Sequence, residues 1–367
     1  MNTRALLSVV TLGVLGALCA PASAGNYAVN CGTNGSSGLV QNQLSAMTGT
    51  NNTLFVKGTC VGYLEITGFN GLTITGLSLT GSLVVSASTG VSLQNVRVYG
   101  DLSSWNHANF SVGNSTVNGY VQITHESTAY FTNVTIPQWS DPTTGGGGSG
   151  IICVSHSECN FSNTTVSGVP SSDPATHSIG VTVGSAARLN FASGRISGFD
   201  WGVLVWNNAT AFFNPDCANL SIDSNPSIGV YVRDGGMVKL EGLSPHDATS
   251  ACPGSVLIRN NGAYGMLAEG GGLGYLYRAQ LAGHAVDGVR VQNGSVVKIR
   301  SSTIDAATTS GRSARVKSNA HLWFDEESNG PAAGSALAGP VCVTNSSSVD
   351  TDNSSTTLTT VATCTSP

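Results

Sequence analysis

Charged side chains are scarce in this sequence. Asp, Glu, Lys and Arg together make up 10% of its 367 residues, whereas an ordinary globular protein has about a quarter. The 20 acidic and 15 basic residues give a net charge of −5. A nucleic-acid-binding surface needs clustered Lys and Arg side chains to neutralise phosphates, so this composition argues against nucleic acid as a partner.

Long apolar segments are missing after the first 20 residues, and no later stretch approaches the roughly 20 apolar residues that a transmembrane helix needs. The early apolar segment, residues 5–20, follows Arg4 and precedes Ala22-Ser23-Ala24. A basic start, a short apolar run and a small-residue cleavage site are typical of a signal peptide. We therefore expect residues 1–24 to be removed on export, leaving a secreted or periplasmic protein without an integral membrane segment.

Cys-x-x-Cys pairs are absent, which argues against a zinc or redox site. Of the nine cysteines, Cys19 belongs to the signal peptide, and Leu18 before it is not the small residue of a lipoprotein signal. The other eight form an even set, as in exported proteins with disulfide bonds. Pairing each with its nearest neighbour, one of about 105 connectivities, gives Cys31–Cys60, Cys153–Cys159, Cys217–Cys252 and Cys342–Cys364.

The histidines also lack metal-ligand spacing. His107, His125, His156, His177 and His246 are scattered through the chain, whereas the ligands of a structural zinc site recur at short fixed intervals. We expect these histidines in loops or turns, and we expect neither a metal nor another cofactor.

Strong helix formers in amphipathic order are missing too, which argues against a helical fold. Glycine is abundant instead, at 46 residues. From Gly62 the chain reads GYLEITGFNGLTITGLSLT, GSLVVSASTGVSLQNVRVY, GDLSSWNHANFSVGNSTVN and GYVQITHESTAYFTNVTIP, which is a period of 19 residues. Apolar and polar residues alternate within each line, as they do in β-strands.

Apolar residues recur in columns at this period. A unit of 19 residues cannot bury a core of its own, so each unit must stack on its neighbours. Three short strands in each unit, stacked at the usual strand spacing of ~4.8 Å, form a parallel β-helix. The columns are Leu64, Leu83, Leu102 and Val121; Ile66, Val85 and Ile123; Ile74, Leu93, Val112 and Phe131; and Leu79, Val98, Val117 and Ile136.

Asparagine keeps the same spacing at Asn95, Asn114 and Asn133. This residue tolerates the left-handed conformation of a turn, and stacked amide side chains can hydrogen-bond to one another. We interpret the three asparagines as a structural ladder rather than a ligand site.

The later coils are longer and begin at glycines 22 to 36 residues apart, from Gly150 to Gly288. Their inward residues are the first and third after glycine, as with Val230 and Val232, so Tyr231 between them points outward. We expect a signal peptide over residues 1–24, an N-terminal cap over 25–60, the β-helix over 61–327 and a C-terminal coil or cap over 328–367.

This pattern resembles the right-handed parallel β-helix proteins of the pectate lyase-like superfamily, particularly exported bacterial members with a VKGTC strand after an N-terminal cap; here that strand is residues 56–60. The resemblance covers nearly the whole mature chain. It implies an all-β, single-stranded right-handed parallel β-helix with an N-terminal cap and disulfides. Known activities on this fold mostly act on acidic polysaccharides, so it also implies an extracellular polysaccharide or cell-surface glycan as the partner.

The candidate binding surface is a shallow strip on the outer face of the later coils. Trp206 and Tyr231 can stack on sugar rings, and Arg233 and Arg290 can clamp a carboxylate with their forked guanidinium groups. Glu269 falls in a column with these residues. The strip therefore predicts binding of an acidic polysaccharide.

Whether the protein is an enzyme stays open from the sequence. A uronate lyase needs a base that takes the proton next to the carboxylate, for which Arg290, Tyr277 and His284 are the candidates. A glycoside hydrolase needs two carboxylates about 5 to 9.5 Å apart, and the sparse acidic residues favour a lyase over a hydrolase. The alternative is a non-catalytic structural or adhesive surface solenoid.

Overall fold

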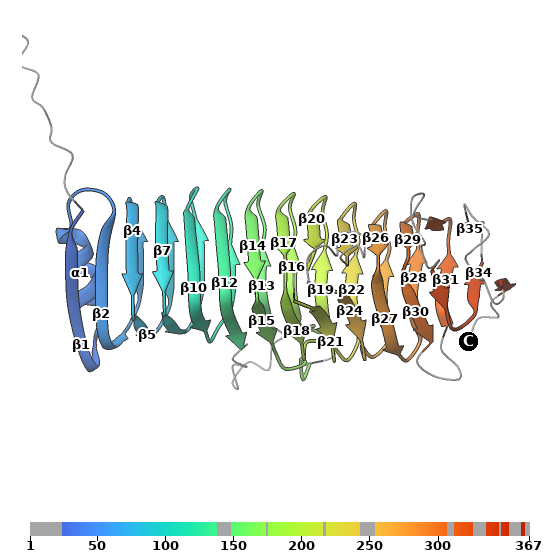
Figure 1. Ribbon diagram of the computed structural model, residues 1–367, viewed down its shortest axis with the longest axis horizontal. Coiled ribbons are helices and arrows are strands. Elements are labelled where there is room, and N and C mark those ends of the chain that lie inside the picture. The colour runs from blue at the N-terminus through green and yellow to red at the C-terminus, as the bar shows by residue number, and fades with distance from the viewer. Residues whose placement is uncertain are drawn as a thin grey trace, which may run out of the picture.

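The computed structural model describes residues 24–137, 148–173, 175–215, 218–242, 254–306, 312–325, 335–344, 346–351 and 361–363. Nearly all of the expected signal peptide lies outside these ranges, as do Cys217, Cys252 and Cys364. The described chain winds into an elongated parallel β-helix with its strands stacked side by side along one axis (Figure 1). None of the helices in these ranges is long and apolar enough to cross a membrane.

Each coil contributes strands to two sheets. The first regular coil contains β3 (Leu64–Thr67), β4 (Asn70–Thr75) and β5 (Ser78–Thr80), and the next contains β6 (Leu83–Ser86), β7 (Thr89–Gln94) and β8 (Arg97–Tyr99). Strands β3 and β6 belong to a 13-stranded sheet, here called sheet B, whereas the other four belong to a 23-stranded sheet, called sheet A. All pairings between successive coils are parallel.

Sheet B continues from β6 to the end of the described chain. Its later strands are β9 (Leu102–Trp105), β11 (Val121–Ile123), β13 (Ser149–Cys153), β16 (Ile179–Val183), β19 (Trp201–Val205), β22 (Ile228–Val232), β25 (Tyr264–Ala268), β28 (Asp287–Gln292), β31 (Arg312–Lys317), β34 (Val341–Val343) and β36 (Val361–Thr363).

Sheet A covers two sides of the solenoid, because the long strands β10 and β12 pair with strands of both sides. Its other strands are β1 (Asn26–Ser36), β2 (Asn52–Val61), β10 (Asn109–Val117), β12 (Thr128–Pro137), β14 (Glu158–Ser162), β15 (Thr164–Ser167), β17 (Arg188–Phe191), β18 (Gly194–Ser197), β20 (Thr210–Phe213), β21 (Leu220–Asp223), β23 (Met237–Glu241), β24 (Val256–Arg259), β26 (Leu273–Tyr277), β27 (Ala279–His284), β29 (Val296–Arg300), β30 (Thr303–Ala306), β32 (His321–Asp325), β33 (Ala336–Leu337) and β35 (Ser348–Thr351).

The 19-residue columns are confirmed. Leu64 pairs with Leu83, Leu83 with Leu102, and Leu102 with Val121, and all four side chains are fully buried. The other columns keep the same register, with Ile74, Leu93, Val112 and Phe131 as one example. The parallel β-helix expected from the repeat is therefore the observed fold.

Aromatic side chains continue the core where the exact repeat stops. The ring of Phe131 stacks on that of Phe161 at 4.6 Å, and Phe161 stacks on Phe191 at 5.6 Å. Phe191 in turn lies 6.0 Å from Phe213. These rings come from successive coils of sheet A and are at most 2% exposed, so each coil buries its interior residues against the next one.

The asparagine ladder has the expected conformation. Asn95, Asn114 and Asn133 have positive φ angles of 53°, 50° and 56°. The Asn133 amide donates to Asn114 Oδ1 at 3.0 Å, and Asn163 extends the ladder by donating to Asn133 Oδ1 at 2.7 Å. The ladder supports the turn between the two sides of sheet A.

One helix, α1 (Gly38–Ala46), lies at the N-terminal end of the described solenoid (Figure 1). It buries Val40 and Leu44 in the hydrophobic core. A disulfide between Cys31 and Cys60 joins β1 to β2 beside it.

A second disulfide joins Cys153 to Cys159, and Cys342 is also disulfide-bonded. The two fully described pairs are those expected from the sequence. Disulfides are typical of proteins from oxidising compartments.

Candidate functional site

The outer face of sheet B carries most of the residues that the sequence singled out. Val203, Val230 and Val289 point inward and are fully buried, so the residues after them point outward. The outward column runs Leu204, Tyr231, Leu267, Arg290 and Arg315 across β19, β22, β25, β28 and β31. A second outward column lies two residues further along each of these coils. It contains Trp206, Arg233, Glu269, Gln292 and Lys317.

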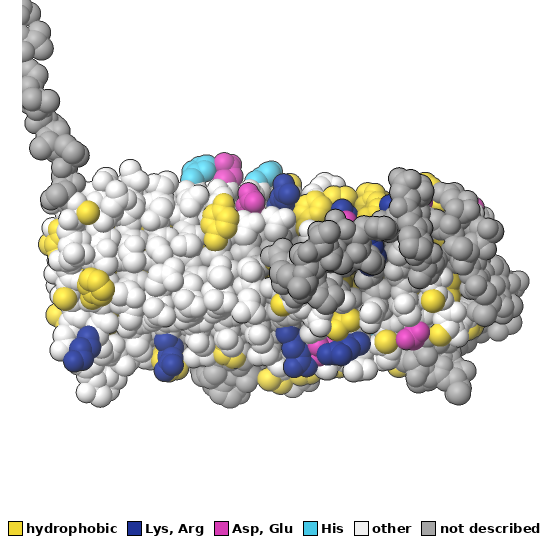
Figure 2. Space-filling view, viewed as in Figure 1, with side chains coloured by type: hydrophobic (Ala, Val, Ile, Leu, Met, Phe, Trp, Pro, Cys, Tyr) yellow, Lys and Arg dark blue, Asp and Glu magenta, His cyan; other side chains and the backbone are white. Residues whose placement is uncertain are grey.

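A third column, which was not predicted from the sequence, lies on the other side of the column that begins at Leu204. It contains Trp201, Ile228, Tyr264, Asp287 and Arg312, each paired with the next. We call the three columns together the sheet B strip. In the space-filling view the strongest gathering of hydrophobic and charged side chains lies in the C-terminal half of the molecule, whereas most of the N-terminal half is white (Figure 2).

The N-terminal part of the strip is aromatic. Trp201 meets Tyr231 edge to face with ring centroids 5.0 Å apart, and His177 stacks on Trp201 at 4.3 Å. Leu204, Tyr231 and neighbouring apolar side chains form a second hydrophobic cluster outside the main core. These rings shield one another, which is why Tyr231 is only 5% exposed although it points outward.

Glycine creates the space for one of these rings. A Cβ atom at Gly184 would lie 2.4 Å from Nε1 of Trp206 in the next coil. Any other residue at position 184 would push the indole away, so Gly184 lets Trp206 lie flat against sheet B.

Hydrogen bonds join the aromatic part of the sheet B strip to the polar side chains next to it. The Tyr231 hydroxyl donates to Glu269 Oε1, and the Gln292 amide donates to Glu269 Oε2. Burial raises the pKa of Tyr231 to about 12, the Glu269 hydrogen bond adds to the increase, and Arg233 opposes it. Tyr231 therefore keeps its proton at neutral pH and is a hydrogen-bond donor.

The C-terminal part of the strip is basic. Arg290 hydrogen-bonds to the Tyr264 hydroxyl and to Gln292 Oε1, the latter at 3.1 Å. Arg312 Nε lies 2.7 Å from Oδ1 of Asp287, whose side chain is fully buried. Arg315 is 8% exposed, and it makes no hydrogen bond or ion pair with any residue in the described ranges.

These cations repel one another. Burial lowers the pKa of Arg315, and the charges of Arg312 and Arg290 lower it further, against an opposing effect of Asp287. Burial also lowers the pKa of Lys317, together with the charges of Arg290 and Arg315. A folded protein that holds like charges close together loses stability, so the arrangement suits an anion that would bind between them.

The three candidate bases lie in different environments. Arg290 is on the strip, but Tyr277 is on β26 of sheet A, where Lys239 and Arg300 lie over its ring. His284 is inside the solenoid and 1% exposed, with Nε2 3.1 Å from the Ile258 carbonyl oxygen. Burial lowers the pKa of His284. The structure therefore does not bring the three residues together: His284 is an interior residue at the end of β27 (Ala279–His284), and Tyr277 lies on another sheet from Arg290.

The strip also contains residues that the sequence reasoning missed. Trp201, Tyr264 and Asp287 stand directly before the glycines that begin their coils, and this position was the available signal. Arg312, Arg315 and Lys317 were missed because their coil has Ser313 in place of glycine.

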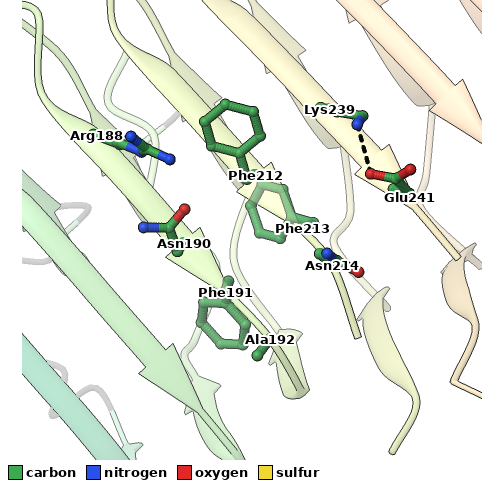
Figure 3. Close-up of a pocket in the computed structure, with 9 residues that line it drawn as sticks. All are labelled: Arg188, Asn190, Phe191, Ala192, Phe212, Phe213, Asn214, Lys239 and Glu241. Carbon is green, nitrogen blue, oxygen red and sulfur yellow. Dashed lines mark ion pairs between the residues drawn. The ribbon is translucent and has the colours of Figure 1, made fainter. Parts of the chain in front are cut away.

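A separate hollow of about 360 Å³ lies on the outer face of sheet A (Figure 3). Arg188, Phe212 and Lys239 line it from β17, β20 and β23. Among the described residues, no three His, Cys, Asp or Glu side chains gather closely enough to hold a metal ion.

Known proteins that are similar to this chain are found among solved structures. No family model matches the chain, and no curated protein matches it. Among solved structures, the chain is similar to the A-module of mannuronan C-5 epimerase AlgE6 from Azotobacter vinelandii. The alignment has 13% sequence identity and a TM-score of 0.38, and it covers 90% of this chain and 94% of that one. At this identity no residue role is transferred to the chain.

Proposed function

We propose that this protein is exported and binds an acidic polysaccharide along the sheet B strip. The observation that carries the proposal is the cluster of Arg290, Arg312, Arg315 and Lys317 on two adjacent strands, in a chain with few charged residues. Only Arg312 has a carboxylate within ion-pair distance among the described residues. The carboxylates of a uronate polymer supply the missing negative charge.

The aromatic part of the strip supplies the second kind of contact. Trp206 and Tyr264 are partly exposed beside the buried cluster around Tyr231, and flat rings of this kind offer apolar faces on which sugar rings stack. The columns run along the solenoid axis with one residue in each coil. A linear chain lying along this axis contacts the aromatic and the basic parts together.

Binding, rather than bond cleavage, is the function that the site geometry supports. Elimination from a uronate needs a group that accepts a proton beside the carboxylate. Tyr231 is a poor base at neutral pH because its pKa is about 12, and the Arg290 guanidinium is already engaged with Tyr264 and Gln292.

A binding assay with matched variants tests the proposal. Trp206→Ala, Arg233→Ala and Arg290→Gln are compared with Trp105→Ala and Arg97→Gln, which remove the same groups from the N-terminal half. We expect the first three to weaken retention on an acidic-glycan array while the two controls bind like the wild type. Equal retention by all five variants, with unchanged melting temperatures, would rule out the sheet B strip as the site.

A spectroscopic assay separates binding from processing. The protein is incubated with polyuronates, and the absorbance of unsaturated products is followed. We expect no increase with time. An increase that Arg290→Gln abolishes would make the protein a lyase, and a protein that neither binds nor cleaves any glycan would be the structural or adhesive solenoid.

A further inference from the structure

A second face of the solenoid carries a regular alternation of aromatic and basic side chains. On the outside of sheet A, Phe212 pairs with Lys239, Lys239 with Tyr275, Tyr275 with Lys298, and Lys298 with Trp323. The inward neighbours of these residues are core residues such as Val238 and Leu240. We call this column of five partly exposed residues the sheet A strip.

Cations lie over two of the three aromatic rings of the strip and over Tyr277 beside the third. Arg188 lies over Phe212 at 5.0 Å, and Lys298 Nζ lies over Trp323 at 4.1 Å. Lys239 Nζ is 5.4 Å from the ring of Tyr277, which stands beside Tyr275 with the ring centroids 6.3 Å apart. Cations over ring faces hold both partners in place, so the strip is pre-organised before any ligand arrives.

Each lysine of the strip forms an ion pair with one carboxylate, and arginine side chains add further positive charge. Lys239 Nζ is 2.6 Å from Glu241, and Lys298 Nζ is 2.8 Å from Asp325, which also accepts a hydrogen bond from Arg300. Burial acts to raise the pKa of Asp325, but the hydrogen bonds and the positive charges of Lys298 and Arg300 together lower it. With Arg188 and Arg300 added to the two lysines, four basic side chains stand beside two acidic ones.

The surface along the strip is hollowed. The cavity of about 360 Å³ lies beside Phe212, and a second one of about 220 Å³ is lined by Tyr277, Arg278 and Arg300. Lys239 and Glu241 line both hollows, which makes them neighbours along the axis. In Figure 3 Phe212 lies between Arg188 and Lys239 on neighbouring strands.

The period of the strip indicates the ligand. Neighbouring strands are ~4.8 Å apart, so aromatic residues recur roughly every 10 Å and lysines occupy the coils between them. One sugar ring of an extended glycan is about as long as one strand spacing. We propose that the sheet A strip is a second binding site, separate from the sheet B strip, for a linear anionic polysaccharide whose repeating contact is a disaccharide: one ring stacks on an aromatic residue, and the carboxylate of the next ring pairs with a lysine.

The experiment uses the full mature protein with the sheet B strip disabled. In an Arg290→Gln/Arg315→Met background, the affinity for uronate oligosaccharides of increasing length is measured by calorimetry at low salt. We expect residual binding whose affinity increases in steps of two sugars. Adding Tyr275→Ala or Lys298→Gln should weaken it roughly tenfold, equivalent to about 1.4 kcal/mol.

Tyr130→Ala is the matched control. Tyr130 stands in the same outward column of sheet A and is 46% exposed, but its coil neighbours are Ser111 and Asn160 rather than lysines. This variant should bind like its background. Circular dichroism and melting curves establish that each variant is folded, and Lys239→Glu replaces any that is not.

Three results would overturn the inference: no residual binding in the disabled background, residual binding unaffected by Tyr275→Ala and Lys298→Gln, or equal weakening by Tyr130→Ala. The reciprocal variant, Tyr275→Ala/Lys298→Gln with an intact sheet B strip, keeps the two proposals distinguishable. If it binds oligosaccharides while the disabled background does not, the sheet B proposal stands and this inference fails. The opposite pattern would support the sheet A strip alone.

Discussion

Replacing Arg315 with methionine should stabilise the protein, which is the reverse of what removing a buried native side chain normally does. Arg315 is 8% exposed, and its lowered pKa means that the fold disfavours its charge. At neutral pH the arginine is nevertheless charged, because an arginine side chain is effectively always protonated in proteins. Its charge therefore costs stability that a neutral side chain recovers.

The size of the effect follows from the neighbouring residues. Methionine keeps an unbranched apolar stem that can fill the space of the arginine methylenes. The substitution removes the repulsion of Arg315 by Arg290 and Arg312, and it also removes the attraction to Asp287. Because removing buried charges changes the free energy of unfolding by between nothing and a few kcal/mol, we expect a net gain in stability of about 1 kcal/mol.

Arg312→Met, three residues away on the same strand, is the control with the opposite sign. Arg312 pairs with Asp287 at 2.7 Å, and the Asp287 side chain is 0% exposed. Removing one partner of a buried pair leaves an uncompensated charge and costs about 3–5 kcal/mol. Comparing Arg315→Met with Arg312→Met therefore distinguishes a cation that we propose contacts the ligand from a cation that stabilises the fold.

Urea unfolding of the three proteins measures both effects. We expect a higher midpoint for Arg315→Met and a lower one for Arg312→Met than for the wild type. At about 1 M salt, where the Debye length is ~3 Å, the gain from Arg315→Met should shrink. If both variants unfold at similarly low urea concentrations, Arg315 is a structural residue and the electrostatic argument for an anionic ligand is wrong.

Three further predictions concern the aromatic stack in the core, the asparagine ladder and the hydroxyl of Tyr231. Phe161→Ala should cost about 3–5 kcal/mol in urea unfolding because it opens the aromatic stack; a loss below about 1 kcal/mol would show that the coils do not depend on this packing. Asn133→Ala should be about 1 kcal/mol less stable than Asn133→Gly, since glycine adopts positive φ without strain; equal stabilities would contradict the ladder geometry. In an absorbance titration, the difference between wild type and Tyr231→Phe should show one tyrosine ionising near pH 12. Because the folded pKa is above the unfolded value of about 10, the stability that the protonated hydroxyl gives is complete below pH 10 and is lost towards pH 12; ionisation near pH 10 would contradict the burial of Tyr231.

The regular part of the fold was predictable because its repeat is exact. Between Gly62 and Pro137 every coil has 19 residues, so each apolar residue lies directly above its counterpart. From β13 to β28, glycine is at the start of each sheet B strand, and this was enough to place Tyr231, Glu269 and Arg290 on one outer face.

The rest of the surface was harder to predict because insertions change the coil length. The sheet A strip could still have been found, since Phe212, Lys239 and Tyr275 each stand ten residues after the first glycine of their coil. The insertions therefore lie elsewhere in the coil, and the number of residues between the sheet B strand and the sheet A strand that follows it stays constant.

His284 illustrates what spacing cannot give. Asn225, Asn261 and His284 occupy one interior turn position in successive coils: the Asn225 amide donates to Asn261 Oδ1, and His284 hydrogen-bonds to the carbonyl oxygen of Ile258. An inward polar side chain at a turn satisfies backbone groups there. Its sequence context, between Gly283 and Ala285, does not differ from that of a surface histidine.

A crystal structure of the protein soaked with an acidic oligosaccharide tests the central claim most directly. We expect sugar density along the outer face of sheet B, with rings beside Trp206 and Tyr264 and a carboxylate between Arg290, Arg315 and Lys317. Density confined to sheet A, or an empty sheet B strip at a ligand concentration that saturates binding in solution, would contradict it.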